Sequence, residues 1–399
     1  MSRSPIRLAV VGGRRGAAFD GVLESLAQRI TLRAVCDLDE GTLAAWRERH
    51  PEITTYTSYE RLLGESDCDA VFLATPLTLH AAQAIQALRA GRHVLSEVIA
   101  ATTVEECWAL VEAVEGTGLT YMMAENCCYM RPNATVRAMV EAGVFGETVY
   151  AEGAYIHDCR NLIVDARGEL TWRGEMRRRW NGNHYPTHSL GPVAQWLGIN
   201  RTDRLASTAT WKTPARAARE YVAERFGADH PAAQPGFFTA GDSATTVIST
   251  AKGHVIVLRV DSTSPRPHNM THYVLQGTKA AYLSGRHAGE EPLVWIDGRS
   301  PGVSPGDAAW EPLSAYAEEY EGPAWRRWGE AARRAGHSGG DFFVIEEFAS
   351  AIESGERPAI DVYDAVTWSS IMPLSLESVA RGGTPVEVPD FRKSARALQ

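Results

Sequence analysis

The sequence predicts a protein of the α/β class with two domains, and three observations support this prediction. The chain has 399 residues, which is too many for one ordinary hydrophobic core. In its first third, short apolar runs alternate with helical patterns, which is typical of a parallel sheet covered by helices. From about residue 147, strand patterns follow one another directly, which favours a large, open, mostly antiparallel sheet. We therefore expect one domain over 1–126 and a second, α+β domain over 127–399, with the last helix returning to the first domain.

Composition and charge exclude several classes of protein. With 44% hydrophobic and 22% charged residues, the chain has the composition of a soluble globular protein. Its net charge of −9 and the lack of a long basic run argue against nucleic acid as a partner. The short basic run at 176–179 indicates a local anion site or an exposed face. No apolar run of about 18 residues predicts a membrane span. The residues before the first strand lack the pattern of a signal peptide, so we expect none.

The six cysteines show neither a C-x-x-C pair nor the spacing of zinc ligands. The consecutive residues His157, Asp158 and Cys159 resemble a ligand cluster, but neighbouring side chains on a strand do not converge on one ion. We therefore expect reduced thiols, no bound metal and a cytoplasmic location.

A glycine turn follows the first apolar run, which covers 6–11. The turn consists of Gly12, Gly13, Arg14, Arg15 and Gly16. A helical pattern follows over 19–28, so the order is strand, glycine turn and helix, as at the start of a Rossmann dinucleotide-binding domain. Glycines let the backbone turn sharply and approach a pyrophosphate at the helix N-terminus. Val11 stands where the first glycine of G-x-G-x-x-G is usually found.

Asp37 ends the second predicted strand, which covers 31–36. It follows the glycine turn by roughly 20 residues, where a carboxylate accepts the ribose hydroxyls of NAD and repels the 2′-phosphate of NADP. The alternative is a cap for the helical pattern that begins at Asp39. We favour the cofactor interpretation and expect NAD.

Polar residues also end the next strands. Thr75 follows the run at 70–74, Glu97 follows the strand that begins at Gly91, and Asn126 follows the run at 120–124. Because ligands of open parallel sheets bind at the carboxyl ends of strands, we expect these residues and Asp37 to line one site.

A short segment in the middle of the chain, 181–192, concentrates polar side chains between glycines and prolines. If a helix begins near Pro186, the spacing of Tyr185 and His188 places both side chains on one face, and Gly191-Pro192 then interrupts or bends that helix. The alternative is a loop-to-helix junction whose polar groups cap the helix.

Strand patterns dominate the second domain. They cover 148–155, 205–211, 243–250, 255–261, 270–276 and 280–284. The segment 215–241 is predicted to be loop-rich, because its apolar pattern is weak. Helices are expected over 341–354 and 361–381, and a return strand within 385–392.

The motifs of the first domain resemble a known family. Thr75-Pro76 with His80, followed by G-R-H-V-L-S-E over 91–97, is similar to the Gfo/Idh/MocA family of NAD(P)-dependent sugar oxidoreductases. That family usually has E-K-P at the fourth strand end, where the lysine serves as acid and base. This chain has Glu97-Val98-Ile99, and a valine cannot transfer a proton.

A narrower branch, the NAD-dependent glycosidases of glycoside hydrolase family 109, resembles the chain more closely. Its motifs recur in order as E-V at 97–98, E-E-C-W at 105–108, E-N-x-C-Y at 125–129, G-x-Y-x-H-D at 153–158, W-R at 172–173, N-G-x-x-Y-P-T-H-x-x-G-P-x-A-Q at 181–195, I-N-R at 199–201, S-P-R-P at 264–267 and Q-G-T-K at 276–279. The glycine turn differs in detail, and His268 stands where the family has a tyrosine after P-R-P.

The resemblance implies a set of cofactor-binding residues and a reaction. The residues expected to bind NAD are Gly12, Gly13, Arg14, Arg15, Asp37, Thr75, Leu77, His80, Glu97, Val98 and Asn126. In the implied reaction, NAD+ takes a hydride from C3 of a sugar, a base removes the acidified C2 proton, and the C1 substituent leaves. Water then adds to the enone and NADH reduces C3. Neither a pair of carboxylates spaced as in ordinary glycosidases nor a metal is required.

The resemblance also assigns roles in catalysis and substrate binding. His188 is the candidate for the C3 hydroxyl proton, because an imidazole titrates near neutrality. Tyr155 and Tyr185 are candidates for the C2 base or for enolate stabilisation. Glu125 resembles an active-site acid of the family, or it only orients Asn126. The residues expected to bind the sugar are Arg173, Tyr155, Tyr185, His188 and His268.

Three functions remain open from the sequence. The first is an NAD-dependent glycosidase, with an α-N-acetylgalactosaminide or related hexoside as the expected substrate. The second is a sugar dehydrogenase or epimerase that releases NADH, with His188 in place of the missing lysine. The third is a nucleotide-sensing protein without catalysis. The expected partners are a small glycoside and further copies of the chain, as a dimer or tetramer through the second sheet.

Overall fold

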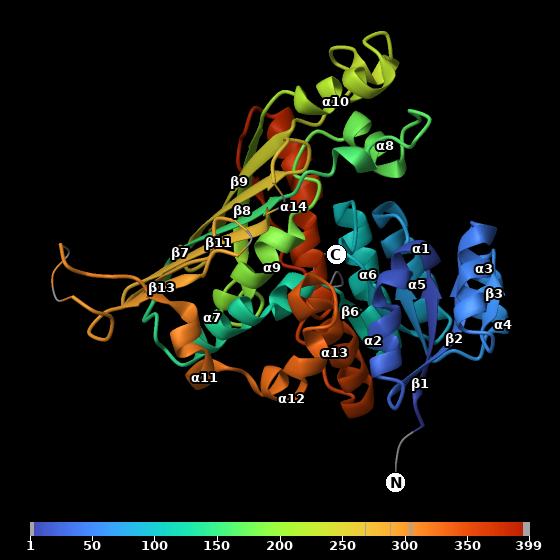
Figure 1. Cartoon of the computed structure of the whole chain (residues 1–399), viewed down its shortest axis with the longest axis horizontal. Helices are drawn as coiled ribbons and strands as arrows, with labels where there is room; N and C mark the ends of the chain where they lie inside the picture. Colours follow the sequence, from blue (N-terminus) through green and yellow to red (C-terminus); the bar gives the residue numbers. More distant parts are fainter. Residues whose placement is uncertain (1–3, 268, 288, 303, 305, 394–399) are drawn as a thin grey trace. The chain divides into compact units, whose positions relative to one another are not determined.

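The computed structural model describes residues 4–267, 269–287, 289–302, 304 and 306–393 (Figure 1). It contains two compact units. The first unit consists of Met1–Arg131, Pro323–Ser370 and Phe391–Gln399, and the second consists of Pro132–Gly322 and Ile371–Asp390. The sequence boundary at 126/127 assigned Pro323–Ser370 to the second domain, whereas the structure groups these residues with the first unit. The reason is that helix α13 (Gly340–Ser354) packs against α2 (Asp20–Ser25) and the short 3₁₀ helix η3 (Asn126–Tyr129).

The first unit contains a six-stranded parallel sheet of the order β3-β2-β1-β4-β5-β6. Its strands are β1 (Ile6–Val11), β2 (Ile30–Cys36), β3 (Thr54–Tyr56), β4 (Ala70–Leu73), β5 (His93–Ser96) and β6 (Tyr121–Met123). This order is that of a doubly wound dinucleotide-binding sheet, in which the direction of winding reverses between β1 and β4. The predicted parallel sheet is confirmed, and the predicted polar residues follow the carboxyl ends of β2, β4, β5 and β6.

The first unit has short helices near its N-terminus, described below, and helix α13. Its further helices are α3 (Glu40–Arg49), α4 (Tyr59–Glu65), α5 (His80–Arg89), α6 (Val104–Thr117), α12 (Pro323–Ala332) and the first part of α14 (Val362–Ala380). The single helix expected over 19–28 is instead a succession of α1 (Gly13–Gly16), the 3₁₀ turn η1 (Ala17–Phe19) and α2. Among the described residues, no helix combines the length and apolar character needed to cross a membrane.

The second unit contains a nine-stranded sheet of the order β14-β13-β12-β11-β7-β10-β9-β8-β15. Its strands are β7 (Thr148–Ile156), β8 (Leu205–Lys212), β9 (Ser243–Thr250), β10 (Val255–Asp261), β11 (Asn269–Gly277), β12 (Ala280–Leu283), β13 (Leu293–Ile296), β14 (Glu311–Pro312) and β15 (Val386–Glu387). Neighbouring strands are antiparallel except β7 and β10, so the predicted mostly antiparallel sheet is confirmed. The predicted return strand is β15, which pairs with β8, whereas β13 and β14 were not predicted.

Helix α9 (Thr187–Trp196) lies against one face of this sheet, over β7, β10 and β11. The closest approach is at Gly153 of β7, where an added Cβ would lie 1.9 Å from the carbonyl oxygen of Ser189. A side chain at position 153 would therefore push the helix off the sheet. Alternate residues of β10 and β11 that face the helix, such as Leu258 and Leu275, are fully buried.

The segment 215–241 was predicted to be loop-rich, and this prediction is wrong in part. It contains helix α10 (Ala217–Phe226), which lies near α8 (Trp172–Arg179) in Figure 1. Apolar residues of this segment pack with two residues before α8 and form a small separate core: Ile163, Val164, Ala218, Val222, Ala232, Ala233 and Phe238. The few apolar residues of this segment find their partners in a distant stretch of the chain, which a local pattern does not reveal.

Candidate active site and cofactor site

The glycine turn of the first unit is shaped for close backbone contact. Gly12 has a φ of 92°, and an added Cβ would lie 2.5 Å from the carbonyl carbon of Ala74, at the end of β4. The carbonyl of Gly13 accepts a hydrogen bond of 2.9 Å from the indole of Trp46, which is fully buried. A Cβ at Gly16 would lie 2.3 Å from the side chain of Val10. The turn therefore has the features of a dinucleotide-binding loop although Val11 replaces the first glycine.

Asp37 lies beside this turn with its carboxylate held by two backbone amides. Arg14 N donates to one oxygen at 3.2 Å and Asp39 N donates to the other at 3.0 Å. Helix α3 is capped by Asp39, which accepts from Thr42 N at 2.7 Å, so the alternative interpretation of Asp37 as this cap is wrong. A half-buried, oriented carboxylate at the end of β2 suits the ribose hydroxyls of a dinucleotide.

Glu97 and Arg15 connect the glycine turn to the end of β5. Their side chains form an ion pair of 2.7 Å, and Glu97 is only 7% exposed. The neighbouring Val98 is buried and apolar, so the position offers no acid or base. The sequence predicted that residue 98 cannot transfer a proton, and the buried, apolar position of Val98 agrees with this prediction.

His80 and Leu77 are buried in the loop after β4. His80 lies between two backbone carbonyls, with Nδ1 2.9 Å from Ile99 O and Nε2 2.8 Å from Thr75 O. Burial lowers the pKa of His80. Both residues were predicted to bind the cofactor. In the structure, their buried positions suit a role in fixing the loops that carry Thr75 and Glu97.

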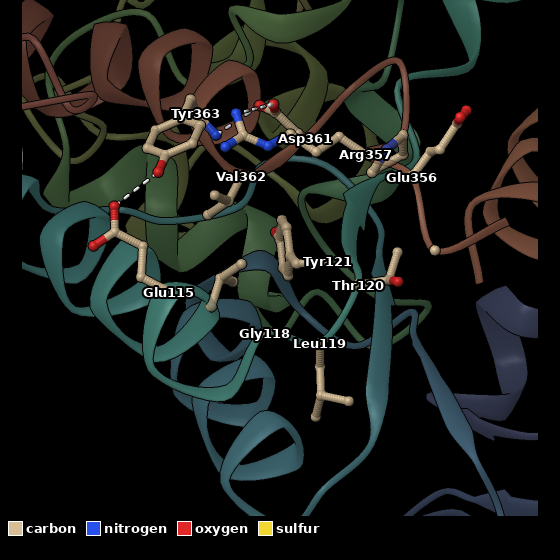
Figure 2. Close-up of a pocket in the computed structure, with 13 residues that line it drawn as sticks. Glu115, Gly118, Leu119, Thr120, Tyr121, Glu356, Arg357, Asp361, Val362 and Tyr363 are labelled. Carbon is tan, nitrogen blue, oxygen red and sulfur yellow. Dashed lines mark hydrogen bonds and ion pairs between the residues drawn. The ribbon is translucent and has the colours of Figure 1, made fainter.

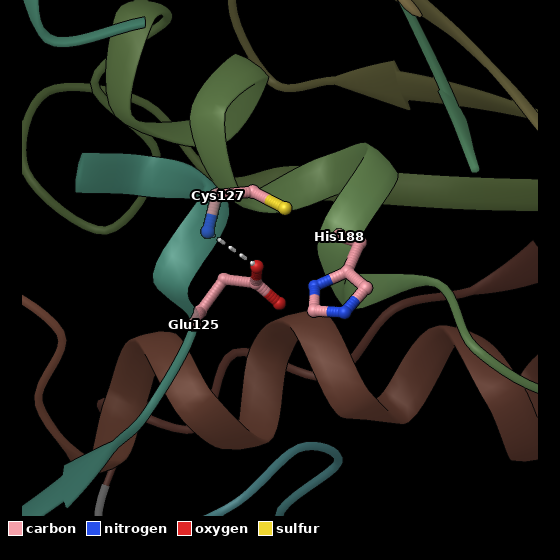
Figure 3. Close-up of side chains that lie close together, drawn as sticks. All are labelled: Glu125, Cys127 and His188. Atoms are coloured by element: carbon pink, nitrogen blue, oxygen red, sulfur yellow. Dashed lines mark hydrogen bonds between the residues drawn. The ribbon is translucent and has the colours of Figure 1, made fainter. Parts of the chain in front are cut away.

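Glu125 and Asn126 follow β6. Glu125 is fully buried, and its carboxylate accepts a hydrogen bond of 3.2 Å from Cys127 N, as Figure 3 shows. The side-chain amide of Asn126 donates to Asp341 at 2.8 Å. Asn126, at the end of β6, is therefore held by a residue of Pro323–Ser370, the later segment of the first unit.

Three aromatic rings meet in the second unit. The ring centroid of Tyr155 lies 5.4 Å from that of Tyr185 and 5.1 Å from that of His188, and the last two lie 5.0 Å apart. Tyr155 belongs to β7, and His188 belongs to α9, as Figure 3 also shows for His188. The sequence prediction that Tyr185 and His188 lie together therefore agrees with the structure, which adds Tyr155 to form what we call the ring cluster.

The other imidazole of segment 181–192, that of His184, has a different environment. His184 Nε2 lies 2.6 Å from Trp180 O, and burial together with the nearby charge of Arg177 lowers the pKa of His184 to about 3. At neutral pH His184 is uncharged and donates to this carbonyl. It therefore stabilises the turn before α9, whereas His188 faces the two phenols.

Helix α9 continues through Gly191 and Pro192, so of the two predicted outcomes, interruption or bending, the interruption is wrong. Pro192 has no N–H and cannot bond to the carbonyl of His188, four residues earlier. Instead, the hydroxyl of Tyr273 on β11 donates to this carbonyl at 2.5 Å. The strand thus replaces the hydrogen bond that the proline removes, and it does so at the residue that carries the imidazole.

Arg173 and Arg177 differ although both lie on α8. The guanidinium of Arg173 stacks over the Trp172 ring at 4.2 Å and is partly exposed, as a sugar-binding role requires. Arg177 is buried, donates to Ser262 Oγ at 3.0 Å and to Gly241 O at 2.5 Å, and has its pKa lowered to about 10 by burial. The interpretation of 176–179 as an anion site or exposed face is therefore wrong for Arg177.

His268, the remaining predicted substrate-binding residue, lies outside the described residues. The S-P-R-P segment before it is anchored at Ser264, whose amide donates to Asp261 at 3.0 Å.

Two further features of the first unit offer polar groups. Asp20, Glu24 and His50 bring possible metal-ligand atoms within 4.8 Å of one another, but Asp20 already pairs with Arg49 at 2.6 Å. A pocket of about 230 Å³ lies beside the start of β6, where the Tyr363 hydroxyl donates to Glu115 at 2.7 Å (Figure 2). It lies at the opposite end of that strand from Asn126, so it is not part of the predicted cofactor site.

Several residues of both sites were not predicted from the sequence. Tyr273 contacts the predicted residue His188, and Asp341, which pairs with His337, contacts the predicted residue Asn126. Arg177 connects α8 to Ser262. Only the run G-H-S-G-G-D at 336–341, with its glycines and polar residues, could have drawn attention to such a site.

Comparisons with known proteins cover nearly the whole chain. Residues 129–397 match the family model "Glycosyl hydrolase 109, C-terminal domain", and residues 6–125 match "Oxidoreductase family, NAD-binding Rossmann fold". The chain is 35% identical to a glycosyl hydrolase family 109 protein of Stenotrophomonas maltophilia, over 98% of this chain and 90% of the relative. It is 34% identical to a protein of Shewanella oneidensis named alpha-N-acetylgalactosaminidase, over 98% of this chain and 86% of the relative. A solved structure of levoglucosan dehydrogenase in complex with NADH and L-sorbose has the same fold, with a TM-score of 0.77, 19% identity and coverage of 97% of this chain and 100% of that chain.

Replacement of Asp37 tests the cofactor site. Asp37→Ala should weaken NAD binding by about 1.5–3 kcal/mol, because hydrogen bonds to a charged acceptor are lost. Asp39→Ala is the matched control, since it removes a neighbouring carboxylate and should lower stability by about 1 kcal/mol without a comparable loss of affinity. Calorimetric titration measures both dissociation constants. NADP in place of NAD as the tightly bound cofactor would contradict this assignment.

Replacement of Tyr273 tests the support of His188. Tyr273→Phe should destabilise the protein by about 1–3 kcal/mol, because the buried carbonyl of His188 loses its donor. Tyr282→Phe is the control: its buried hydroxyl has no hydrogen-bond partner among the residues that the structure describes, and both tyrosine rings lie 5.7 Å from Trp196. Adding Pro192→Ala to Tyr273→Phe should recover part of the loss by restoring an N–H. Thermal unfolding measures the series, and equal losses for the two tyrosines would disprove the explanation.

Proposed function

Because the chain belongs to glycosyl hydrolase family 109, as its sequence motifs predicted, we propose that it is an NAD-dependent glycosidase. The observation that carries this proposal is the ring cluster, in which two phenols and an imidazole have ring centroids 5.0 to 5.4 Å apart. Such groups suit the movement of protons next to a carbonyl. A direct hydrolysis would instead need an acid and a carboxylate placed on either side of the glycosidic bond.

The residues of the first unit fit a dinucleotide. The backbone at Gly12 leaves no room for a side chain, and the Asp37 carboxylate is oriented beside it. We propose that the glycine turn holds the pyrophosphate, that Asp37 binds the adenosine ribose, and that Glu97, Val98 and Asn126 border the nicotinamide. When bound, the nicotinamide accepts a hydride from C3 of the sugar and later returns it.

The residues of the second unit supply the proton transfers in this proposal. His188 accepts the proton of the C3 hydroxyl as the hydride leaves C3, so that C3 becomes a ketone. Tyr155 or Tyr185 removes the C2 proton, the electron pair forms the C1–C2 double bond, and the aglycone leaves from C1. Water then adds its hydroxyl to C1 and a proton returns to C2. The hydride returns to C3 and His188 returns the proton to the C3 oxygen, so the balance of the full cycle is hydrolysis. Arg173 is proposed to bind a hydroxyl or acetamido oxygen of the sugar, and Glu125 to act as the buried acid next to Asn126.

We propose an α-N-acetylgalactosaminide, or a related hexoside with a free C3 hydroxyl, as the substrate. The named relative from Shewanella oneidensis, which is 34% identical, supports this choice. The alternative is a sugar dehydrogenase or epimerase that releases NADH, and the oxidoreductase family match over 6–125 favours it. Val98 argues against this alternative, because the acid and base of the sugar oxidoreductases is missing at that position.

We further propose that copies of the chain associate through the sheet face opposite α9. Several residues on this face are apolar and half-buried, next to the polar residues Glu152, Arg259 and Gln276: Val257, Val274, Ala281, Leu283, Leu293 and Trp295. Val274→Arg on the central strand β11 should convert a dimer or tetramer to monomers in analytical ultracentrifugation. A monomeric wild-type protein would refute the proposal.

The six cysteines, none of which forms a disulfide, support a cytoplasmic location.

Hydrolysis in D2O tests the elimination route directly. The product should carry deuterium at C2, because the C2 proton leaves before the aglycone and is replaced from solvent, and NADH should not accumulate. His188→Ala should lower the rate by about 10²- to 10⁴-fold, since C3 oxidation then lacks its base. Tyr155→Phe should mainly slow the C2 step and leave transient NADH visible.

Mass spectrometry and NMR of the released sugar, with absorbance for NADH, provide the measurements. Full retention of protium at C2 would exclude elimination. Stoichiometric growth of NADH would favour the dehydrogenase.

A further inference from the structure

An unusual backbone segment lies between α12 and α13 in the first unit. His337, Ser338 and Gly339 have φ values of 51°, 53° and 93°, so three consecutive residues are left-handed. Two of them are not glycines, for which this conformation is uncommon and costs energy. A segment of this kind is kept only where its surroundings fix it, and such segments are frequent at functional sites.

The surroundings that fix this segment belong to the end of β6. His337 Nδ1 lies 2.9 Å from a carboxylate oxygen of Asp341, which is 1% exposed and accepts at 2.8 Å from the amide of Asn126. A Cβ at Gly340 would lie 2.4 Å from Asn126 O, so backbone packs on backbone. The segment is thus built onto Asn126, a residue predicted to border the cofactor.

Four charged groups interact at this point. Besides His337 and Asp341, they are Arg15 of α1 and Glu97 after β5, which form their own ion pair. The hydrogen bond that His337 donates to Asp341 raises the pKa of His337 above its ordinary value. Burial and Arg15 oppose this effect, and Glu97 adds to it. With His337 protonated the four charges sum to zero, and after its proton leaves they sum to −1.

The position of this cluster in the sheet indicates which part of the cofactor it meets. A dinucleotide lies across the reversal between β1 and β4, and Asp37 at the end of β2 suits the adenosine ribose. The nicotinamide nucleotide then lies over the carboxyl ends of β4, β5 and β6. Glu97 follows β5 and Asn126 follows β6, so the charged cluster is on the nicotinamide side.

We propose that His337, oriented by Asp341, is a cofactor-side residue whose protonation sets the relative affinity of the protein for NAD+ and NADH. The nicotinamide ring carries a positive charge in NAD+ and none in NADH. A neutral cluster favours NADH relative to NAD+, and a cluster of charge −1 favours NAD+. Because His337 loses its proton as pH rises through its pKa, the preference for NADH should fall over the same pH range. This inference rests on the NAD site of the proposed function but not on the glycosidase reaction.

The test is an exchange titration of the full-length protein with its bound cofactor. NADH is added at a series of pH values, the bound NADH is read by its fluorescence, and the displaced NAD+ is quantified. The exchange constant in favour of NADH should fall by about fivefold or more between about pH 5.5 and 8.5 in the wild-type protein. His337→Gln should abolish this dependence. His50→Gln, which breaks another histidine–carboxylate pair of 2.7 Å with Asp20, should retain it.

Asp341→Asn provides a second variant that keeps the histidine. Without the carboxylate the pKa of His337 falls, so the transition in the exchange constant should move to lower pH. A pH-independent wild-type constant, an unchanged dependence in His337→Gln, or an unmoved transition in Asp341→Asn would each overturn the proposal. A protein that binds neither NAD+ nor NADH would refute the cofactor site itself, whereas a loss of glycosidase activity alone would leave this inference intact.

Discussion

The close contact between strand β7 and helix α9 is the constraint on which the proposed catalytic groups depend. An added Cβ at Gly153 would lie 1.9 Å from the carbonyl oxygen of Ser189, so the helix reaches the sheet only where the strand has no side chain. Two residues along the strand, Tyr155 projects to the same face, and the residue before Ser189 carries the imidazole of His188. The missing side chain at one position therefore brings a phenol and an imidazole to a ring-centroid distance of 5.1 Å.

The backbone of α9 shows how a helix defect is used. A proline inside a helix usually leaves a carbonyl without a donor and bends the helix. In this protein the freed carbonyl belongs to His188, and the Tyr273 hydroxyl of β11 satisfies it. The hydrogen bond joins the residue with the proposed catalytic imidazole to the centre of the sheet, so the position of His188 is set by tertiary structure rather than by the helix alone.

The cationic side chains of Arg15, His337 and Arg177 have different kinds of partner. In the first unit, Arg15 pairs with Glu97 and His337 with Asp341, so each cation meets a carboxylate. In the second unit, Arg177 is buried and donates to hydroxyl and carbonyl oxygens within 241–263. Burial lowers the pKa of Arg177. In our proposal these paired charges lie on the nicotinamide side of the cofactor site, where the local charge balance affects binding. Arg177 of the second unit instead connects α8 to Gly241, Ser262 and Thr263.

The sequence by itself determined the parallel first sheet, the antiparallel second sheet, the polar strand ends and the block that contains Tyr185 and His188. These features depend on local periodicity, on glycine and proline, and on motif spacing, all of which act between near neighbours in the chain. Only the tertiary structure decided that α9 runs through Pro192, that Arg177 is buried, that Asp39 caps α3, and that 336–341 packs on Asn126. Most of these features depend on a partner that is distant in the chain, and the cap depends on a choice between two nearby carboxylates. Neither kind of contact produces a periodic pattern in the sequence.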